Sequence, residues 1–564
     1  MAGIERTGAL LASDPHPFER GLDRNAANFV PLSPVTFLER SARVYPRKVA
    51  VRHGRHAYTY GELSARCRRL ASSLARHGIG WGDTVAIMAP NTPPLLEAHY
   101  AVPALGAVLN PLNVRLDART LAACLDHGGA KLLLTDAEFA PVMREAVALC
   151  ARRPVVVDLD DSEGPGHGDL TTRVGASTYE TLLSEGDPAF EWPGPRDEWD
   201  AAALLYTSGT TGDPKGVVYH HRGAYLNALG NALAFGLGPR SVYLWTLPMF
   251  HCSGWTYTWA VTAVGGTHVC LRRVEAGLIF DAIDKHRVTH LCAAPIVLSM
   301  MINAPAGAKR SFAHAVDIAT GGAAPPSAVI EAMEGMGFNV THLYGLTESY
   351  GPATLCAPQD EWAALDLESR ARQMARQGVP MPTLADAIVA TPEDAEPVAC
   401  DGVTLGEVLL RGNTIMKGYL KNVAATQSAF AHGWYHTGDL AVWHPDGYIE
   451  VKDRSKDIIV SGGENISSLE VEECLYRHPQ VMEAAVVARP DPRWGESPCA
   501  FVTLKPGAAD VDAADILQWC RDRIAHFKVP KHVVFGPLPK TATGKIQKNV
   551  LRERAKSDEA KRAS

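Results

Sequence analysis

The sequence predicts an α/β protein with three parts: a large N-terminal domain of helix-covered, mostly parallel sheets, a small antiparallel β subdomain within it, and a small α+β C-terminal domain. Three observations predict this. Apolar segments alternate with amphipathic ones from about residue 36 to residue 317, short strands separated by turns follow after about residue 385, and the last stretch has strand and helix signals of its own. Strand–helix alternation is typical of parallel sheets covered by helices. We expect a flexible segment at 1–30, the main domain at 31–455 with the antiparallel part at 385–455, and the last domain at 456–564.

The first elements follow from short apolar runs and the amphipathic stretches between them. Residues 84–88, 131–135 and 154–159 are predicted strands, and 93–105 and 141–149 are predicted helices. The same rhythm returns later, with strands at 291–295 and 316–319 and a helix at 326–336.

The antiparallel part is predicted by short strands at 387–389, 406–410 and 448–451. Between the last two lies H-P-D-G at 444–447, a hairpin signal because Asp-Gly tolerates the positive φ of a primed turn. In the last domain Ser467 with Glu470 three positions later is a capping-box pattern that opens a helix.

Composition bounds the class of protein. The chain has 564 residues, 46% hydrophobic and 21% charged, enough for several globular units. Its net charge of -7 disfavours a nucleic-acid or anionic-membrane binder. The eleven cysteines are odd in number and lack C-x-x-C spacing, which disfavours disulfides and zinc. No leader pattern and no run of about 18 apolar residues stands out, so we expect a cytoplasmic protein with a homodimer as one option for its assembly.

The most informative stretch is Y-T-S-G-T-T-G-D-P-K-G at 206–216, which follows an apolar strand at 201–205. Glycines let backbone N–H groups approach an anion, and hydroxyls and Lys215 add donors, so this loop fits a polyphosphate. The spacing differs from a Walker A loop. An ordinary polar loop is the alternative that the stretch by itself leaves open.

Further motifs follow in a fixed order. They are H-L-Y-G-L-T-E-S at 342–349, Y-H-T-G-D at 435–439, D-R-S-K-D at 453–457, S-G-G-E-N-I at 461–466 and P-K-T-A-T-G-K at 539–545. Together the set resembles the adenylate-forming superfamily of acyl-CoA synthetases, peptide-synthetase adenylation domains and beetle luciferases. The resemblance covers about residues 36–552.

The resemblance implies ATP, Mg²⁺ and coenzyme A as cofactor and co-substrates, a small carboxylic acid as substrate, and roles for single residues. Tyr344 corresponds to the aromatic that stacks on adenine, Thr347 to an α-phosphate contact, and Glu348 to the Mg²⁺ ligand. Asp439 corresponds to the ribose-binding carboxylate. The remaining nucleotide contacts implied are Thr207, Ser208, Gly209, Thr210, Thr211 and Lys215 of the phosphate loop, Gly322, Ala323 and Gly345, Arg454, and Lys545, which bridges the α-phosphate and the substrate carboxylate.

Elementary chemistry makes these roles sensible. Attack of a carboxylate on the α-phosphorus gathers negative charge, so catalysis is mainly positioning and neutralisation by cations such as Lys545. No G-x-S-x-G nucleophile elbow is present. The second step needs that cation removed and a path for a thiol, and the resemblance implies that the C-terminal domain rotates about Lys456. Gly462, Gly463 and Glu464 would then face the active site, where glycines allow close approach of pantetheine.

One motif bears on which acid the enzyme would accept. It is L-P-M-F-H-C-S-G-W at 247–255, which resembles the family's pocket-entrance motif with His251 as gating residue. Gly321 borders the same pocket by resemblance. Six aromatic residues fall within the seventeen positions from Tyr243 to Trp259, and core packing explains Tyr243 and Trp245 equally well. Trp255, Tyr257 and Trp259 are predicted to narrow or line the acyl pocket. Bulky rings favour a short- or medium-chain or aromatic acid.

Branch features narrow the resemblance further. G-G-T-H-V-C-L-R-R at 265–273, R-Q-G-V at 376–379 and E-N-I-S-S at 464–468 resemble methylmercaptopropionate-CoA ligase, plant acyl-activating enzymes and short- to medium-chain fatty acid–CoA ligases. Ser253 and the segment 256–258 depart from that branch. Three readings stay open: an acid–CoA ligase, an adenylating enzyme of secondary metabolism with a carrier-protein thiol or amine as acceptor, and a non-catalytic scaffold. The retained Lys545, Glu348 and Asp439 argue against a scaffold.

Overall fold

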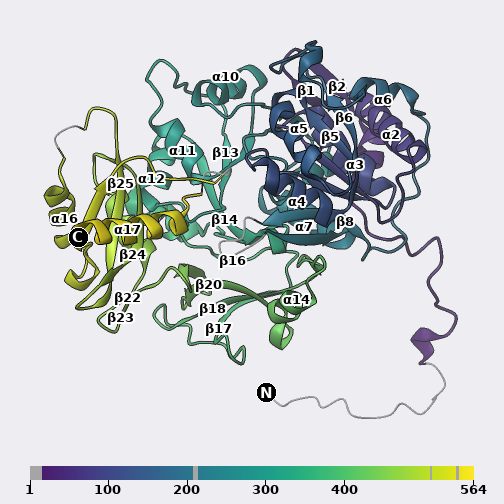
Figure 1. The fold of residues 1–564 in the computed structure, drawn as a ribbon. Helices are drawn as coiled ribbons and strands as arrows, with labels where there is room; N and C mark the ends of the chain where they lie inside the picture. Colours follow the sequence, from purple (N-terminus) through teal and green to yellow (C-terminus); the bar gives the residue numbers. More distant parts are fainter. Residues whose placement is uncertain (1–15, 208–213, 509–510, 542–544, 564) are drawn as a thin grey trace.

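The structure is a computed structural model that describes residues 16–207, 214–508, 511–541 and 545–563. Most of the N-terminal domain is built on two large sheets (Figure 1). In order, the first sheet consists of β16 (Val379–Pro380), β15 (Gly351–Leu355), β14 (Asn339–Leu346), β13 (Asp317–Thr320), β12 (His290–Ala293), β10 (Val242–Leu244), β11 (Thr267–Cys270), β1 (Val49–His53) and β2 (His56–Thr59). The second consists of β19 (Gly418–Tyr419), β9 (Lys215–His220), β8 (Ala201–Thr207), β4 (Val108–Pro111), β3 (Thr84–Met88), β5 (Ala130–Asp136), β6 (Val155–Leu159) and β7 (Ser177–Thr178).

The inner strands of both sheets are parallel, as the alternation predicted. β10 to β14 pair in parallel in the first sheet, and β3 to β6 in the second. Helices such as α3 (Pro93–Ala104), between the parallel strands β3 and β4, supply the crossovers. The helices of this domain are α1 (Val35–Val44), α2 (Tyr60–Arg76), α3, α4 (Ala118–Gly128), α5 (Ala140–Leu149), α6 (Tyr179–Glu185), α7 (His221–Ala234), α9 (Tyr257–Ala263), α10 (Ala276–His286), α11 (Pro295–Ile302), α12 (Ser327–Gly335), α13 (Leu367–Met374) and α14 (Val423–Ala429). A continuous buried core joins the helices to the sheets. The predicted α/β class is therefore confirmed.

One predicted strand ends early. The strand expected at 291–295 stops at Ala293, and Pro295 begins α11. Proline suits the first helical position, where its missing N–H is not needed.

The antiparallel part is also confirmed. β17 (Asp386–Ala390), β18 (Leu405–Arg411), β20 (Tyr435–Trp443) and β21 (Ile449–Arg454) form a four-stranded antiparallel sheet. The hairpin at 444–447 differs from the expected primed turn, because only Gly447 has a positive φ (+86°) and Asp446 does not. Gly447 N–H donates to the carbonyl of His444 at 2.9 Å, and His444 N–H donates to that of Tyr448 at 2.9 Å. Pro445 presets the first turn position, so one left-handed glycine is sufficient.

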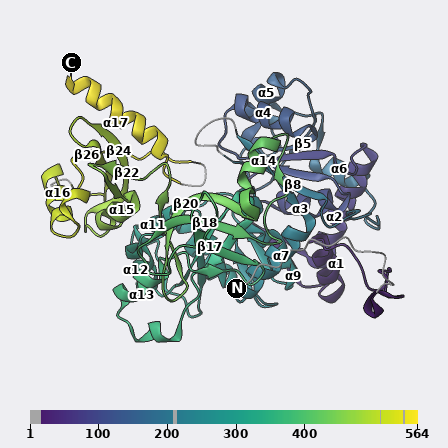
Figure 2. The same cartoon turned by 90° about the horizontal axis from the view of Figure 1, so that it is seen from below.

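The C-terminal part has a sheet of β23 (Glu464–Ile466), β22 (Ile459–Ser461), β25 (Gly495–Leu504) and β24 (Val481–Asp491), with β26 (His532–Phe535) on β25, and the helices α15 (Ser468–Tyr476), α16 (Ala513–Arg521) and α17 (Lys548–Ala563). Both views place these elements together on one side of the molecule (Figures 1 and 2). Ser467 caps α15 by accepting from Glu470 N–H at 3.2 Å. The Glu470 carboxylate turns to Lys528 (2.6 Å), so the cap is not reciprocal.

Two domain limits stay predictions. The boundary expected at 455/456 lies between the end of β21 at Arg454 and the start of β22 at Ile459. In the N-terminal segment, residues 16–30 are exposed and contain the short 3₁₀ helix Pro17–Glu19, and 1–15 lie outside the described residues. No helix in the described part is both long and apolar enough for a bilayer crossing.

Candidate active site

Most of the predicted site residues that the structure describes line one cleft of about 2710 Å³. Parallel strands present their carboxyl ends at one edge, where ligands bind in open α/β sheets. β8 ends at Thr207, β13 leads into Gly321 and β14 leads into Thr347. The predicted residues among those described that line the cleft are Thr207, Lys215, His251, Trp255, Gly321, Gly322, Ala323, Tyr344, Gly345, Thr347, Glu348, Asp439, Arg454, Lys456 and Lys545.

Tyr344, Asp439 and Arg454 form one corner of the cleft. The Tyr344 hydroxyl donates to Oδ2 of Asp439 at 2.7 Å, and Nε of Arg454 donates to Oδ1 at 3.1 Å. Burial raises the pKa of the Tyr344 phenol well above its usual value, and the neighbouring Asp439 carboxylate adds to the rise. Burial alone would lower the pKa of Arg454, but Asp439 reverses the sign and the net shift is upward. The corner therefore presents an aromatic ring and a carboxylate held in place by a permanent cation.

Glu348 lies in the short helix Thr347–Ser349, directly after β14, and is 9% exposed. Its Oε1 accepts from the Tyr419 hydroxyl at 2.8 Å, and its carbonyl accepts from Met416 N–H at 2.7 Å. Burial raises the pKa of this carboxyl. Within the described residues no three His, Cys, Asp or Glu side chains gather as a metal cluster. A single hard oxygen ligand at a phosphate-binding cleft still fits Mg²⁺, which keeps waters and substrate phosphates around it.

Lys545 enters the cleft from the C-terminal part, so the two predicted charge centres Lys545 and Glu348 share one cavity. Its backbone N–H donates to Oγ1 of Thr541 at 3.1 Å. Burial lowers the pKa of Lys545 to about 8, and the nearby Arg454 contributes in the same direction. The Lys545 charge also helps burial to lower the pKa of His251 to about 4.

The phosphate loop is described only at its ends. Thr207 ends β8 and Lys215 begins β9, and the two residues pair across the ladder. Nζ of Lys215 lies 4.8 Å from the centre of the Tyr419 ring, which places it beside Glu348. The predicted contacts Ser208, Gly209, Thr210 and Thr211 lie outside the described residues.

Trp255, predicted for the acyl pocket, lines the cleft beside Gly321. A Cβ added to Gly321 would lie 3.0 Å from Cη2 of this indole and 2.3 Å from the Leu343 carbonyl, so the ring edge lies against the glycine backbone. His251 also lines the cleft, and its Nε2 lies 3.8 Å from Sγ of Cys252.

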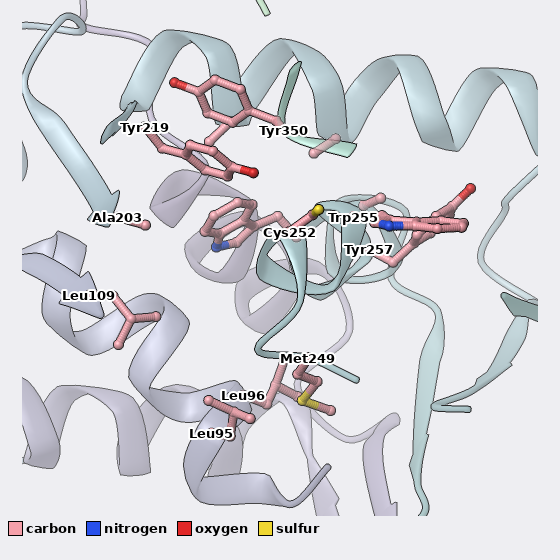
Figure 3. Packing of buried hydrophobic residues seen from close by; sticks show 14 of the residues in the cluster. Leu95, Leu96, Leu109, Ala203, Tyr219, Met249, Cys252, Trp255, Tyr257 and Tyr350 are labelled. Atoms are coloured by element: carbon pink, nitrogen blue, oxygen red, sulfur yellow. The ribbon is translucent and has the colours of Figure 1, made fainter. Parts of the chain in front are cut away.

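The structure corrects two of the aromatic residues. Tyr257 and Trp259 are fully buried and belong to the core, not to the described lining of the cleft. Figure 3 shows Tyr257 among the buried hydrophobic residues. Tyr257 stacks on Tyr243 with ring centres 5.1 Å apart, and Nε1 of Trp259 donates to the carbonyl of His99 at 3.1 Å. Both residues lie on α9, which packs against α7 and α1, so their rings point into the protein.

The residues predicted for the hinge and for the path of the thiol divide into two groups. Lys456 lies on the cleft, and burial lowers its pKa. Gly462, Gly463 and Glu464 form the tip of the β22–β23 hairpin and are absent from the described lining. Both glycines have positive φ (+61° and +90°). In this orientation the structure does not bring the hairpin tip to the site.

Several residues that fix the positions of the predicted site residues were not themselves predicted. Tyr419 fixes Glu348, and Cys252 lies 3.5 Å from Oγ1 of Thr347. Glu407 accepts from Gly438 N–H at 2.7 Å and pairs with His436 at 2.9 Å, which fixes the turn before Asp439. These contacts join residues far apart in the chain, and no local pattern announces them. Three histidines of the motif regions serve packing: His220 and His221 are fully buried, and His436 pairs with Glu407.

Comparisons with known proteins agree with this geometry. A family model described as AMP-binding enzyme matches residues 38–420, and one described as AMP-binding enzyme C-terminal domain matches 470–545. The chain is 52% identical to acetate–CoA ligase CCL3 of Humulus lupulus, covering 95% of this chain and 96% of the relative. It is 50% identical to the peroxisomal acetate/butyrate–CoA ligase AAE7 of Arabidopsis thaliana, with the same coverage. Among solved structures, o-succinylbenzoate CoA synthetase of Bacillus subtilis with its acyl-adenylate is similar at a TM-score of 0.76, with 28% identity, covering 93% of this chain and 99% of that chain.

The relatives overturn one expectation. Five similar Arabidopsis proteins are peroxisomal by name, which points away from the cytoplasmic location expected from the sequence. That expectation is wrong because composition cannot separate these compartments. Peroxisomal import uses a short address that a receptor reads, and it leaves the physical character of the folded protein unchanged.

Proposed function

This chain belongs to the AMP-binding enzyme family and is an ATP-dependent acid–thiol ligase, and from that premise we propose that its acid is short-chain, its acceptor is coenzyme A and its metal is Mg²⁺. The observation that carries the proposal is the shared cleft. One cavity is bordered by the cation Lys545, the carboxylate Glu348 and the Tyr344–Asp439–Arg454 corner. Trp255 borders it too, and we call this residue the acid wall because we propose that it lines the pocket for the substrate acid.

In the proposed first step a carboxylate oxygen of the acid bonds to the α-phosphorus of ATP. The bond from that phosphorus to the bridging oxygen breaks, and the electron pair leaves with pyrophosphate. The anionic carboxylate must approach the anionic α-phosphate while negative charge grows on the leaving pyrophosphate, so the Lys545 ammonium between acid and α-phosphate stabilises the transition state. Thr347 is the proposed α-phosphate contact beside it.

The nucleotide is held by residues of this chain alone. Tyr344 offers its ring to adenine, and Asp439 accepts from the ribose hydroxyls, with Gly322, Ala323 and Gly345 providing close backbone approach. Lys215 and Thr207 lie at the phosphate end. Glu348 would hold Mg²⁺, which when bound neutralises phosphate charge. Because one chain contributes all these groups, the chemistry requires no second copy of the protein. Whether the protein is a monomer or a homodimer is a separate question, which analytical ultracentrifugation answers.

In the proposed second step the thiol sulfur bonds to the acyl carbon, and the bond from that carbon to the phosphate oxygen breaks, which releases AMP. Lys545 lines the cleft in this orientation, so we propose that the C-terminal domain turns about Lys456 and presents Gly462–Gly463–Glu464 instead. Glycines at that tip would allow a narrow pantetheine arm to pass.

The short-chain proposal follows from Trp255. Its indole occupies the space next to Gly321 and closes the acid pocket at that depth. Relatives named for acetate and butyrate ligation support the same size class. Each additional methylene would need room that the ring occupies.

The test is hydroxamate trapping with ATP over straight-chain acids from acetate to decanoate and substituted benzoates, followed by AMP release with and without CoA. We expect adenylates of acids with two to four carbons and CoA-dependent AMP release. Adenylate formation without any response to CoA favours a carrier-protein thiol or amine as the acceptor. No adenylate with any acid defeats the proposal.

A further inference from the structure

The acid wall is built from an unusual backbone. Five consecutive residues, Cys252 to Thr256, have φ between +42° and +62°, and only Gly254 among them is a glycine. This segment, called the left-handed turn below, includes the short element α8 (Cys252–Trp255). Residues with a Cβ rarely adopt this conformation, and never by preference in a run. Such a conformation persists only where surrounding contacts impose it.

Buried asparagines on α7 supply those contacts on one side. Nδ2 of Asn231 donates to the Trp255 carbonyl at 2.7 Å and reaches Oγ1 of Thr256 at 2.9 Å. The Thr256 hydroxyl donates to Oδ1 of Asn227 at 3.1 Å, and the two asparagines bond to each other at 2.8 Å. Asn231 and Thr256 are fully buried. The backbone of Trp255 is therefore held in position by a buried hydrogen bond to its carbonyl.

The other side is held by a buried histidine. Oγ of Ser253 lies 2.9 Å from Nε2 of His99, whose Nδ1 lies 2.7 Å from the Leu95 carbonyl. Burial lowers the pKa of His99 to about 4, so the ring is neutral, Nδ1 carries the proton and Nε2 accepts from Ser253. The hydroxyls of both Ser253 and Thr256 therefore bond within the left-handed turn or to the helices beside it.

The same asparagine pair reaches the phosphate side. Nδ2 of Asn227 donates to the Ser349 carbonyl at 2.9 Å, one residue after Glu348. Gly351 fits closely as well, since a Cβ there would lie 3.0 Å from Cα and Cβ of Trp255. One turn of α7 thus connects the acid wall to the segment that carries Thr347 and Glu348.

We propose that Thr256 and Asn231 are specificity-determining positioning residues, which fix the backbone of Trp255 in the left-handed turn and thereby set the depth of the acid pocket. The inference rests on the proposed function, in which Trp255 closes that pocket. Neither residue belongs to the described lining of the cleft, so both act through the position of the indole against Gly321.

The decisive variant is Thr256→Val, which keeps the shape and removes the hydroxyl. Thr256→Ser restores the hydroxyl and is the rescue. Thr258→Val is a matched control, because Thr258 is equally buried two residues away and its hydroxyl has no hydrogen-bond partner within the described residues. For each protein, kcat/KM is measured by pyrophosphate release with acetate, butyrate and hexanoate, and KM is measured for ATP.

We expect Thr256→Val to raise the hexanoate-to-acetate ratio of kcat/KM by about fivefold or more, because the lost hydrogen bonds free the wall. The ATP KM should stay within about twofold, and Thr256→Ser and Thr258→Val should keep the parent ratio. An unchanged ratio in Thr256→Val, an equal fall for all three acids, or the same shift in Thr258→Val overturns the inference. If Thr256→Val is insoluble, Ser253→Ala carries the same expectation through the His99 side.

A parallel Trp255→Leu variant separates this inference from the proposed function. If Trp255→Leu changes the ratio and Thr256→Val does not, only the positioning role fails. If Trp255→Leu leaves the ratio unchanged, or the parent activates no acid, the assignment of the pocket fails and the positioning role fails with it.

Discussion

Asp439 lies directly opposite Arg454 in the ladder between β20 and β21, and the guanidinium Nε donates to the carboxylate at 3.1 Å. Tyr344 donates to the other oxygen of the same carboxylate. This pairing orients an acceptor toward the cleft before any nucleotide arrives. The register of the two strands thus organises the site, because Arg454, the last residue of β21, fixes the carboxylate of Asp439 on β20.

The first prediction concerns that carboxylate. Asp439→Asn keeps the shape but turns one acceptor into a donor, so the ribose contact and the bond from Arg454 both weaken. We expect the KM for ATP to rise by about tenfold or more, with a smaller change in the KM for the acid. Steady-state kinetics measure both constants. Asp401→Asn, on an exposed loop, is the control, and a rise confined to the acid would contradict the assignment.

The second prediction concerns Lys545 and the two half-reactions. Lys545→Ala should lower acyl-adenylate formation from free acid by about 10² to 10³, because a cation at the reacting phosphate is lost. Thioester formation from supplied acyl-AMP should stay within about threefold. Single-turnover assays of each half separate the outcomes. Equal loss in both halves would defeat the two-orientation mechanism.

The third prediction is a pH dependence. Burial and Arg454 lower the pKa of Lys545 to about 8, so the ammonium is present below that pH and lost above it. We therefore expect kcat/KM for ATP in adenylation to fall as pH rises through about 8. The limb in kcat should lie higher, since bound phosphate favours the charged lysine. Lys545→Arg keeps its charge throughout, and its profile should lack this fall between pH 7 and 10; a fall shared by both proteins assigns it to another group.

The sequence could predict what is local or carried by a motif. Strands such as Thr84–Met88 are buried apolar runs, and the motif residues Tyr344, Glu348 and Asp439 indeed meet in one cleft. Contacts such as Tyr419 with Glu348 join residues 71 positions apart and leave no spacing signal. The left-handed turn contains one glycine, so backbone propensity gives no warning of it.

Tyr257 and Trp259 show a different limit. Their aromatic character is equally suited to a pocket and to a core, and only the direction in which α9 packs decides between them. Side-chain direction is set by tertiary contacts that composition does not encode.

The fourth prediction concerns chain length. Trp255→Leu replaces the indole that lies against Gly321 with a smaller side chain, so longer acids gain room. With about 0.8 kcal/mol for each buried methylene, two extra methylenes correspond to roughly tenfold in kcat/KM for hexanoate relative to butyrate. Tyr257→Phe, in the core behind the wall, should keep the parent ratio. A uniform loss for all acids would indicate damage to packing and not a change of pocket depth.

The last prediction concerns the contact that holds this domain orientation. Helix α12 lacks a side-chain cap of its own at Pro326, and Glu473 of α15 supplies one: its Oε2 accepts from Ser327 N–H at 3.0 Å. Arg477, the residue that caps the C-terminal end of α15, pairs with Glu368 of the N-terminal domain at 3.0 Å. These bonds exist only while Lys545 occupies the cleft, if the domain turns as proposed.

Glu473→Gln should therefore shift the population away from the adenylating orientation. We expect about threefold slower adenylation and unchanged or faster thioester formation from acyl-AMP, because a state that loses stabilisation loses occupancy. Glu553→Gln, which removes a partly exposed pair with Lys556 on α17, is the matched control within the same domain. A parallel slowing of both half-reactions would show that Glu473 serves general stability, since a purely structural loss has no reason to spare the second step.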